Sequence, residues 1–314
     1  MAPRTVSRVV NDEGGYSQAT RKRILDAIEE LGYRPNLLAR GLITRRSGTV
    51  GLVVGNLTDP LVLALAASAQ DSFRERGRSM FFASCDDDAD RQSAVLQSLW
   101  SHAVEGMIVI PVTDSSRQLA DYSRRGLPIV AVGSLVDARN VTSVMFDLEA
   151  GFRLAVRHLL DSGRRSIGVI GSVASSCALG PDDEGTGDAF GASGVGAQLV
   201  RVQPTVVGGA AGLEQLLELE PDLDAILTCN DLVAIGAVGA ARARGRRVPE
   251  DIGVIGCNDI EPASLVTPSL TTIRLDAGLL AEAVAAALQG LIDEPGEQRD
   301  PVVLPVELVV RDSA

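Results

Sequence analysis

The stretch Val50-Gly51-Leu52-Val53-Val54 is almost entirely apolar, and it is followed by an amphipathic run, Leu61–Arg76, and by a second apolar run, Met80–Ala83. A strand that is buried on both faces requires such a continuous apolar run. A strand, a helix and a second strand in this order predict a right-handed βαβ unit with parallel strands.

The same alternation continues along the chain and predicts an α/β fold built from two lobes with parallel sheets. Further strands are expected at Met107–Ile110, Ile129–Val132, Ile167–Ile170, Ala225–Leu227 and Val254–Ile255, and further helices at Arg91–His102, Gly151–Ser162, Asp231–Arg244 and Ala277–Ile292. Because a strand-like tail, Val302–Val310, follows the last helix, we expect lobe 1 to span about 48–144 and 276–303, and lobe 2 about 145–275 and 304–314. The segment Gly171–Gly196 is rich in Gly, Ser and Asp, which predicts a loop or an irregular helix.

The composition excludes several classes of protein. Of the 314 residues, 46% are apolar and 22% are charged, so the chain can bury a core and is not disordered as a whole. It has no run of the roughly 18 apolar residues that a membrane span needs and no apolar signal-peptide core, which predicts a cytoplasmic protein. The cysteines form no C-x-x-C pair and are expected to be reduced and without a metal: Cys85, Cys177, Cys229 and Cys257.

The charge is distributed unevenly. Residues 1–50 hold nine Lys or Arg and five Asp or Glu, a net charge of +4, whereas the remainder carries −16, which gives the total of −12. A basic head on an acidic body suggests a small module that binds polyanions, joined to a body that repels them.

The head is helical in its pattern. A short helix is expected over Thr5–Val10, and Ser17 can cap a second one, Gln18–Leu31, before Gly32 and Pro35 end it. The second helix carries one apolar face, made by Ile24, Leu25, Ile28 and Leu31. A further helical run, about 36–43, precedes a linker, and the head is expected to span residues 1–47.

Three motifs of the head have fixed spacings: Thr5-Val6-Ser7-Arg8-Val9-Val10-Asn11, Ser17-x-x-Thr20-Arg21 and Leu31-Gly32-Tyr33-Arg34-Pro35-Asn36-x-x-Ala39-Arg40-x-Leu42. They resemble T-V-S-R-V-L-N, S-x-x-T-R and L-G-Y-x-P-N-x-x-A-R-x-L of the LacI/GalR (lactose-repressor-type) transcriptional regulators. The resemblance extends to Glu307–Ser313, which is similar to the family's ending E-L-V-V-R-x-S. The family's first helix, T-x-x-D-V-A-x-x-A-G-V-S, is not found before the recognition helix, so the helix-turn-helix is expected to be incomplete at its N-terminus.

The resemblance implies a role in DNA binding for particular residues of the head. The N-terminal part of the recognition helix would enter the major groove, where Arg4 and Arg8 could read guanine. The region 36–43 resembles the family's hinge helix, in which a leucine at the position of Leu42 wedges into the minor groove. The residues implied in base, phosphate or hinge contacts are Pro3, Arg4, Thr5, Ser7, Arg8, Asn11, Ser17, Thr20, Arg21, Asn36, Ala39 and Leu42.

The rest of the chain resembles the periplasmic-binding-protein-like core of the same family. Such a core holds a small polar effector, by family default sugar-like, at the carboxyl ends of parallel strands. The candidate residues at strand ends are Asn56, Thr58, Asp59, Asp86, Ser134, Asp147, Asn230 and Asn258, with Asp231 and Asp259 beside the last two. For each of them the alternative is a helix cap or a turn.

The sequence departs from the family's effector site in three places. Leu61 and Val62 replace a usual aromatic pair, and Ser134 replaces a frequent arginine. The R-x-x-G-F pattern of the second lobe is lost within Ala174–Val195.

Common enzyme motifs are not found in the sequence. There is no G-x-S-x-G, no G-x-x-x-x-G-K-[ST] and no H-x-x-x-H, and the single lysine, Lys22, lies in the head. The run Asp86-Asp87-Asp88 could attract a metal ion, but acidic residues at strand ends are more often solvated or cap helices. We therefore expect no enzyme activity, no cofactor and no metal.

The resemblance to this family implies a homodimeric transcriptional regulator, expected to be a repressor, that binds a pseudo-palindromic operator in double-stranded DNA and responds to a small effector. The alternative is a cytoplasmic small-molecule-binding protein whose DNA-binding head is non-functional.

Overall fold

The computed structural model describes residues 2–10, 14–32, 47–112, 115–172, 197–297 and 299–314. These residues form two compact units, Met1–Gly48 and Thr49–Ala314. The predicted hinge at 36–43 and nearly all of Gly171–Gly196 lie outside the described residues.

The first unit contains two helices that contact each other, α1 (Pro3–Val10) and α2 (Gln18–Glu30). Val9 of α1 and Ile24 of α2 are buried. The apolar face predicted for α2 is only partly covered, because Leu25 and Leu31 are 39% and 79% exposed.

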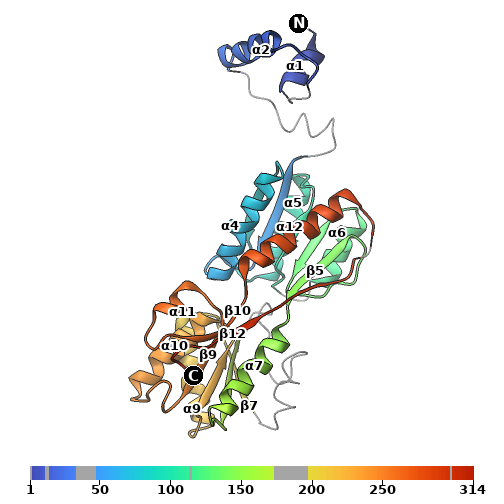
Figure 1. Ribbon diagram of the computed structural model, residues 1–314. Helices are drawn as coiled ribbons and strands as arrows, with labels where there is room; N and C mark the ends of the chain where they lie inside the picture. The colour runs from blue at the N-terminus through green and yellow to red at the C-terminus, as the bar shows by residue number, and fades with distance from the viewer. Residues whose placement is uncertain (1, 11–13, 33–46, 113–114, 173–196, 298) are drawn as a thin grey trace. The chain divides into compact units, whose positions relative to one another are not determined.

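The second unit contains two lobes, each built around a six-stranded sheet of described residues (Figure 1). The sheet of lobe 1 has the order β11-β5-β4-β3-β1-β2, and all its pairs are parallel. Its strands are β1 (Thr49–Val54), β2 (Ser79–Ser84), β3 (Met107–Val109), β4 (Ile129–Val132), β5 (Val141–Phe146) and β11 (Val302–Leu304).

The sheet of lobe 2 has the order β12-β10-β9-β8-β6-β7, and only β12 is antiparallel to its neighbour. Its strands are β6 (Ile167–Ser172), β7 (Ala197–Val202), β8 (Ala225–Thr228), β9 (Gly253–Asn258), β10 (Thr271–Arg274) and β12 (Glu307–Val309).

Helices cover both faces of each sheet. In lobe 1, Val50, Leu52 and Val54 of β1 pack in a core with α4 and α12, whereas Val53 points to a second core with α5 and α6. This alternation explains why β1 is apolar along its whole length. The helices are α4 (Pro60–Glu75), α5 (Ala89–Ser101), α6 (Ser116–Arg124) and α12 (Ala277–Asp293) in lobe 1, and α7 (Leu148–Asp161), α9 (Val206–Leu219), α10 (Asp231–Ala243) and α11 (Glu261–Leu265) in lobe 2.

In the described part of the chain, the polypeptide passes between the two sheets at three places: from β5 to α7, from β10 to α12, and from β11 to β12. The strand-like tail Val302–Val310 is thus two short strands in different sheets, interrupted at Pro305. None of the helices in the described part of the chain combines the length and the apolar character that crossing a membrane needs.

Candidate DNA-binding head and effector site

The recognition helix predicted from the sequence is α1, and it exposes two arginines. Arg4 and Arg8 are exposed, and Thr5 is half-buried. The guanidinium of Arg8 lies over Gly15, where a Cβ atom would be 3.2 Å from Arg8 Nη1. The backbone of Pro3 and Ser7 lies in the same helix.

Ser17 begins α2 as its N-cap, as the sequence predicts. Its hydroxyl accepts a hydrogen bond from Thr20 N at 3.2 Å and lies 2.9 Å from Thr20 Oγ1. Such a bond satisfies one of the unpaired amides at a helix start. The Ser17 hydroxyl therefore caps α2, and the Thr20 hydroxyl is hydrogen-bonded to it.

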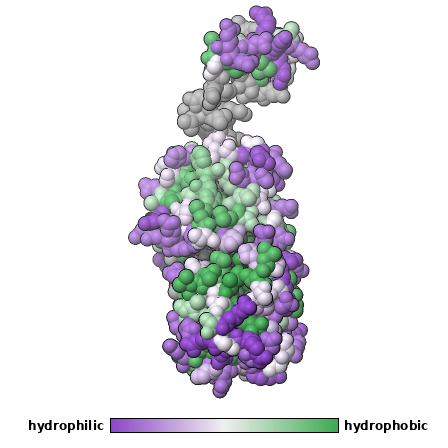
Figure 2. Space-filling model, turned by 90° about the vertical axis from the view of Figure 1, so that its left-hand side faces the viewer, coloured by the Kyte–Doolittle hydropathy of each residue, from purple (hydrophilic) through white to green (hydrophobic). Residues whose placement is uncertain are grey.

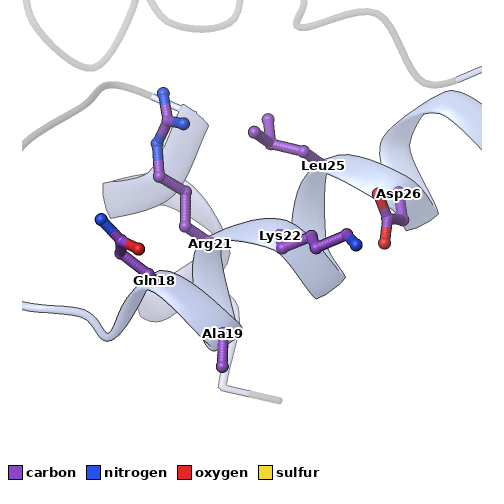
Figure 3. Close-up of a pocket in the computed structure, with 6 residues that line it drawn as sticks. All are labelled: Gln18, Ala19, Arg21, Lys22, Leu25 and Asp26. Carbon is purple, nitrogen blue, oxygen red and sulfur yellow. The ribbon is translucent and has the colours of Figure 1, made fainter.

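One face of α2 carries a hollow lined by polar, charged and apolar side chains (Figure 3). Arg21 and Lys22 are exposed beside Leu25. The hollow is lined by Gln18, Ala19, Arg21, Lys22, Leu25 and Asp26. The predicted contacts of Asn11, Asn36, Ala39 and Leu42 lie outside the described residues.

In lobe 1, Asn56 is the centre of a small polar group at the carboxyl ends of β1 and β2. Its Nδ2 donates to Asp87 Oδ2 at 2.5 Å, and its Oδ1 accepts from Thr58 N at 3.1 Å and from Thr58 Oγ1 at 2.9 Å. Asp87 reaches this position because residue 55 is glycine, where a Cβ atom would lie 2.1 Å from Asp87 Oδ1. The sequence indicated the acidic run but not that Asp87, rather than Asp86, contacts Asn56.

The other acidic candidates of lobe 1 are engaged locally. Asp86 is exposed and pairs with Arg91. Asp59 caps α4 by accepting from Leu61 N at 2.9 Å, and burial raises its pKa. Asp88 caps α5. Among the described residues, no three His, Cys, Asp or Glu side chains are grouped as a metal ion would require.

Ser134 and Asp147 follow neighbouring strands, β4 and β5. Ser134 is half-buried just past the end of β4. Asp147 caps α7 by accepting from Ala150 N at 2.9 Å, and its own amide donates to Leu304 O at 2.9 Å. Asp147 thereby connects the carboxyl end of β5 to that of β11.

In lobe 2, Asn230 lies two residues past β8, Asn258 is the last residue of the adjacent strand β9, and both are buried. Asn230 caps α10: its Oδ1 accepts from Val233 N at 2.9 Å and its Nδ2 donates to Pro204 O at 3.4 Å. An amide can accept two hydrogen bonds and donate two, so half of its capacity is used in the fold. Asn258 has a φ of +112°, in the positive range that residues other than glycine seldom adopt.

A polar cluster beneath these two asparagines was only partly foreseen from the sequence. Asp231 accepts from Thr272 Oγ1 at 2.6 Å and from Ile260 N at 2.8 Å, and burial raises its pKa to about 7. Asp259 pairs with Arg274 and with Arg311, each at 2.7 Å. Thr272, Arg274 and Arg311 come from β10 and the C-terminal segment, and no local pattern predicts which carboxylate they meet.

Amide, hydroxyl and carboxylate groups thus lie at the carboxyl ends of parallel strands in both lobes. Amides and hydroxyls donate and accept hydrogen bonds and carboxylates accept them, which suits a small ligand with many hydroxyl groups.

Comparisons with known proteins agree with this architecture. Residues 2–36 match the family described as bacterial regulatory proteins, lacI family, and residues 156–314 match a periplasmic binding protein-like domain. The chain is 32% identical to the HTH-type transcriptional regulator CelR of Thermobifida fusca, over 98% of this chain and 94% of that one. It is 29% identical to the ribose operon repressor of Halalkalibacterium halodurans, over 98% and 92% of the two chains.

Solved structures of relatives resemble the whole chain. The lac repressor dimer bound to operator and the anti-inducer ONPF has a TM-score of 0.86 at 26% identity, covering 99% of this chain and 94% of that one. A complex of CelR with cellobiose has a TM-score of 0.75 at 29% identity, covering 100% and 96%. The helical head that matches the lacI family model, the two-lobed core and these relatives lead to one conclusion: the chain belongs to the LacI family of transcriptional regulators and is not an enzyme.

Proposed function

We propose that this regulator is a repressor whose affinity for its operator is set by a sugar-like effector bound at the carboxyl ends of the strands. The observation that carries the proposal is the combination, in one chain, of a basic helical head with a two-lobed core that has polar groups at the strand ends. Relatives with both parts include a ribose operon repressor and a lac repressor bound to operator. Because its target is chromosomal DNA, we place the protein in the cytoplasm.

The proposed DNA-binding unit is the head at residues 1–47, with Arg4 and Arg8 reading bases and Arg21 among the phosphate contacts. Arg4, Arg8 and Arg21 are exposed on α1 and α2. Phosphate contacts by such side chains hold the protein on the duplex, and contacts to base edges specify the sequence. The hinge at 36–43 and the wedge by Leu42 stay predictions within this proposal.

A homodimer suits this proposal, because a two-fold protein meets a two-fold operator. Lobe 1 exposes large apolar side chains that a second copy could cover: Leu63 on α4 and Phe81 and Phe82 on the edge strand β2 are 49%, 45% and 38% exposed. Figure 2 shows apolar side chains gathered on one face of the core. A contiguous exposed apolar patch is a common feature of interaction surfaces.

The effector would act by linkage between the core and the head. A ligand that favours one arrangement of the lobes shifts the affinity for operator by a coupling free energy of about 1–3 kcal/mol, roughly 5- to 150-fold. We place the effector contacts at Asn56, Asp87 and Asn258, whose side chains lie at the strand ends.

DNA binding is tested with the full chain by selection from a random duplex library, followed by fluorescence anisotropy on the enriched sequences. We expect an inverted repeat to be enriched and its affinity to fall steeply with salt, because the released counterions scale with the phosphates contacted. Equal affinity for the selected and the scrambled duplex would rule out the repressor and favour a binding protein with a non-functional head.

Effector binding is tested by thermal shift against mono- and disaccharides, polyols and nucleobases, because a ligand that binds only the native state raises the melting temperature. In Asn258→Gly the amide is removed but the positive φ remains unstrained, so the shift should disappear without loss of fold. The matched control is Asn140→Gly, another asparagine with a positive φ (+62°), which lies before β5 and should keep the shift. A shift that survives in Asn258→Gly would remove Asn258 from the site.

A further inference from the structure

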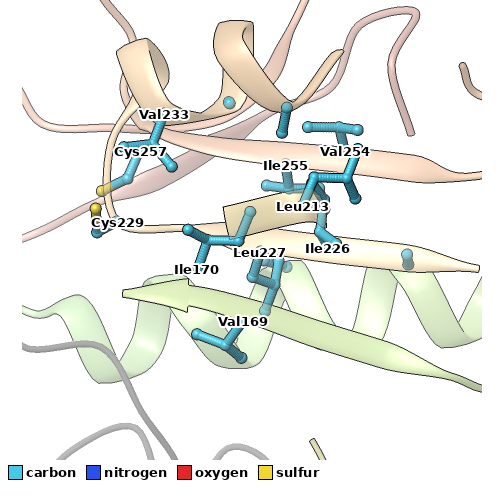
Figure 4. Packing of buried hydrophobic residues seen from close by; sticks show 14 of the residues in the cluster. Val169, Ile170, Leu213, Ile226, Leu227, Cys229, Val233, Val254, Ile255 and Cys257 are labelled. Carbon is cyan, nitrogen blue, oxygen red and sulfur yellow. The ribbon is translucent and has the colours of Figure 1, made fainter. Parts of the chain in front are cut away.

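Two cysteines lie side by side at the carboxyl ends of β8 and β9. These strands are parallel neighbours in which Leu227 is paired with Ile255. Cys229 and Cys257 each follow two residues later, and side chains two residues apart share a face of a sheet. Cys229 N still donates to Ile170 O at 2.9 Å, so the chain follows the sheet up to this residue. Figure 4 shows the two sulfur atoms turned toward each other at one end of the strands.

The spacing of parallel strands fits a disulfide at this place. Neighbouring strands lie about 4.8 Å apart, and the Cα atoms of disulfide-bonded cysteines are usually about 4.4–6.8 Å apart. Cys229 and Cys257 are thiols in the structure, and at most 2% of either residue is exposed. Continuing the register of Leu227 and Ile255 by two residues brings Cys229 and Cys257 opposite each other, at the spacing that a disulfide can span.

The pair directly precedes the two effector candidates of lobe 2. Cys229 is followed by Asn230, and Cys257 is followed by Asn258. Asn230 holds the start of α10, and Asn258 has a positive φ. A disulfide between Cys229 and Cys257 would fix the distance between the backbone positions of Asn230 and Asn258.

We propose that Cys229 and Cys257 form a reversible disulfide when a hydroperoxide oxidises them, and that this bond changes the affinity of lobe 2 for its effector. The second half of the statement rests on the proposed function, whereas the first half does not.

The reaction balances with hydrogen peroxide as the oxidant. One thiolate attacks the O–O bond, an S–O bond forms, and hydroxide leaves with the electron pair and takes up a proton as water. The second thiolate then attacks the sulfur of the sulfenic acid, the S–S bond forms and a second water leaves. The two thiols together lose two electrons and two protons, and one peroxide becomes two waters.

Cys85 offers a matched control, because it is equally buried but lies in lobe 1. Its Sγ donates to Val54 O at 3.2 Å. Burial, with a further contribution from Asp87, raises the pKa of this thiol. A raised pKa lowers the thiolate fraction and therefore the reactivity toward peroxide.

The disulfide is tested on the full chain by incubation with hydrogen peroxide, digestion under non-reducing conditions and mass spectrometry. We expect one cross-linked pair of peptides, Cys229 with Cys257, that is lost on treatment with dithiothreitol and is retained in Cys85→Ser. Cys229→Ser and Cys257→Ser should each abolish it. Oxidation of these thiols without this cross-link, or a link from either one to Cys177, would overturn the proposal, and the wild-type digest shows this without any variant.

The consequence for the effector is read by comparing the thermal shift of the reduced and the oxidised protein with the same sugar. We expect at least a several-fold change in the apparent Kd after cross-linking, restored by dithiothreitol. An unchanged Kd with a complete cross-link would overturn the second half of the proposal alone. If no sugar shifts the reduced protein, the proposed effector class fails while the mapped disulfide stands.

Discussion

Asp231 lies beneath the carboxyl ends of β8 and β10 with none of its surface exposed. It accepts hydrogen bonds from Thr272 Oγ1 and Ile260 N, which stabilise the charged form. Burial opposes them and prevails, helped by the like charge of Asp259, so that the pKa of Asp231 rises from 3.8 to about 7. Between about pH 4 and pH 7 the Asp231 carboxyl group is therefore protonated in the folded protein but ionised in the unfolded chain.

This proton makes the free energy of unfolding fall as the pH rises from about 4 to about 7, because the native state binds more protons than the unfolded chain in that range. The shift corresponds to a loss on the order of 4 kcal/mol across the range. Asp231→Asn cannot titrate, so its free energy of unfolding should lack this decline. Urea unfolding at pH 5, 6 and 7 checks it, and parallel pH profiles for both proteins would contradict the assignment.

At the scale of elements, α9 and α10 are packed so closely that glycines form their contact. A Cβ atom on Gly236 of α10 would lie 1.9 Å from Val206 O, and one on Gly209 of α9 would lie 2.0 Å from Val233 O. Both obstacles are backbone atoms, which a rotamer change cannot move. This packing places the start of α10, and with it Asn230, beside the start of α9.

Gly236→Ala should therefore cost about 3 kcal/mol of stability, since the helices must separate to admit the methyl group. Gly239→Ala is the matched control on the same helix, because Gly239 is exposed and nothing lies within 4 Å of its added Cβ. It should stabilise the protein by about 0.5–1 kcal/mol, since alanine favours a helix. Thermal or urea unfolding of both variants distinguishes them. Equal effects would mean that α9 and α10 can admit the methyl group without a loss of stability.

At the scale of the whole molecule, charge separates the two units. The basic exposed side chains Arg4, Arg8 and Arg21 belong to the head, whereas the residues beyond position 50 carry a net charge of −16. Attraction to DNA is therefore confined to the head, and the core opposes close approach of the duplex.

The affinity for the selected operator should accordingly depend on salt through the head alone. Arg21→Gln should weaken binding to all sequences and reduce the slope of log K against log salt by about 1, as the loss of one phosphate contact requires. Arg76→Gln, which changes an exposed arginine of the core, should leave the slope unchanged. Anisotropy titrations at several salt concentrations measure both, and equal slopes for Arg21→Gln and the wild type would remove Arg21 from the interface.

Sequence patterns predicted best the helices and strands in which each buried face packs only against apolar side chains. β1 was found because both its faces are apolar cores, and α4 because one of its faces is. β10 was missed because Thr271 and Thr272 read as polar, although both are fully buried. Their polar atoms are satisfied by Ser313 and Asp231, which lie more than 40 residues away along the chain.

The amino-acid sequence by itself determined the family, the α/β class and the separation of a basic head from an acidic core, because motifs, hydrophobic periodicity and charge are local properties of a chain. Only the tertiary structure decided that Asp87 contacts Asn56, that Asp231 lies buried beneath Thr272, and that Cys229 and Cys257 meet. These contacts depend on which strands become neighbours and in which register, and both are set by packing between distant segments.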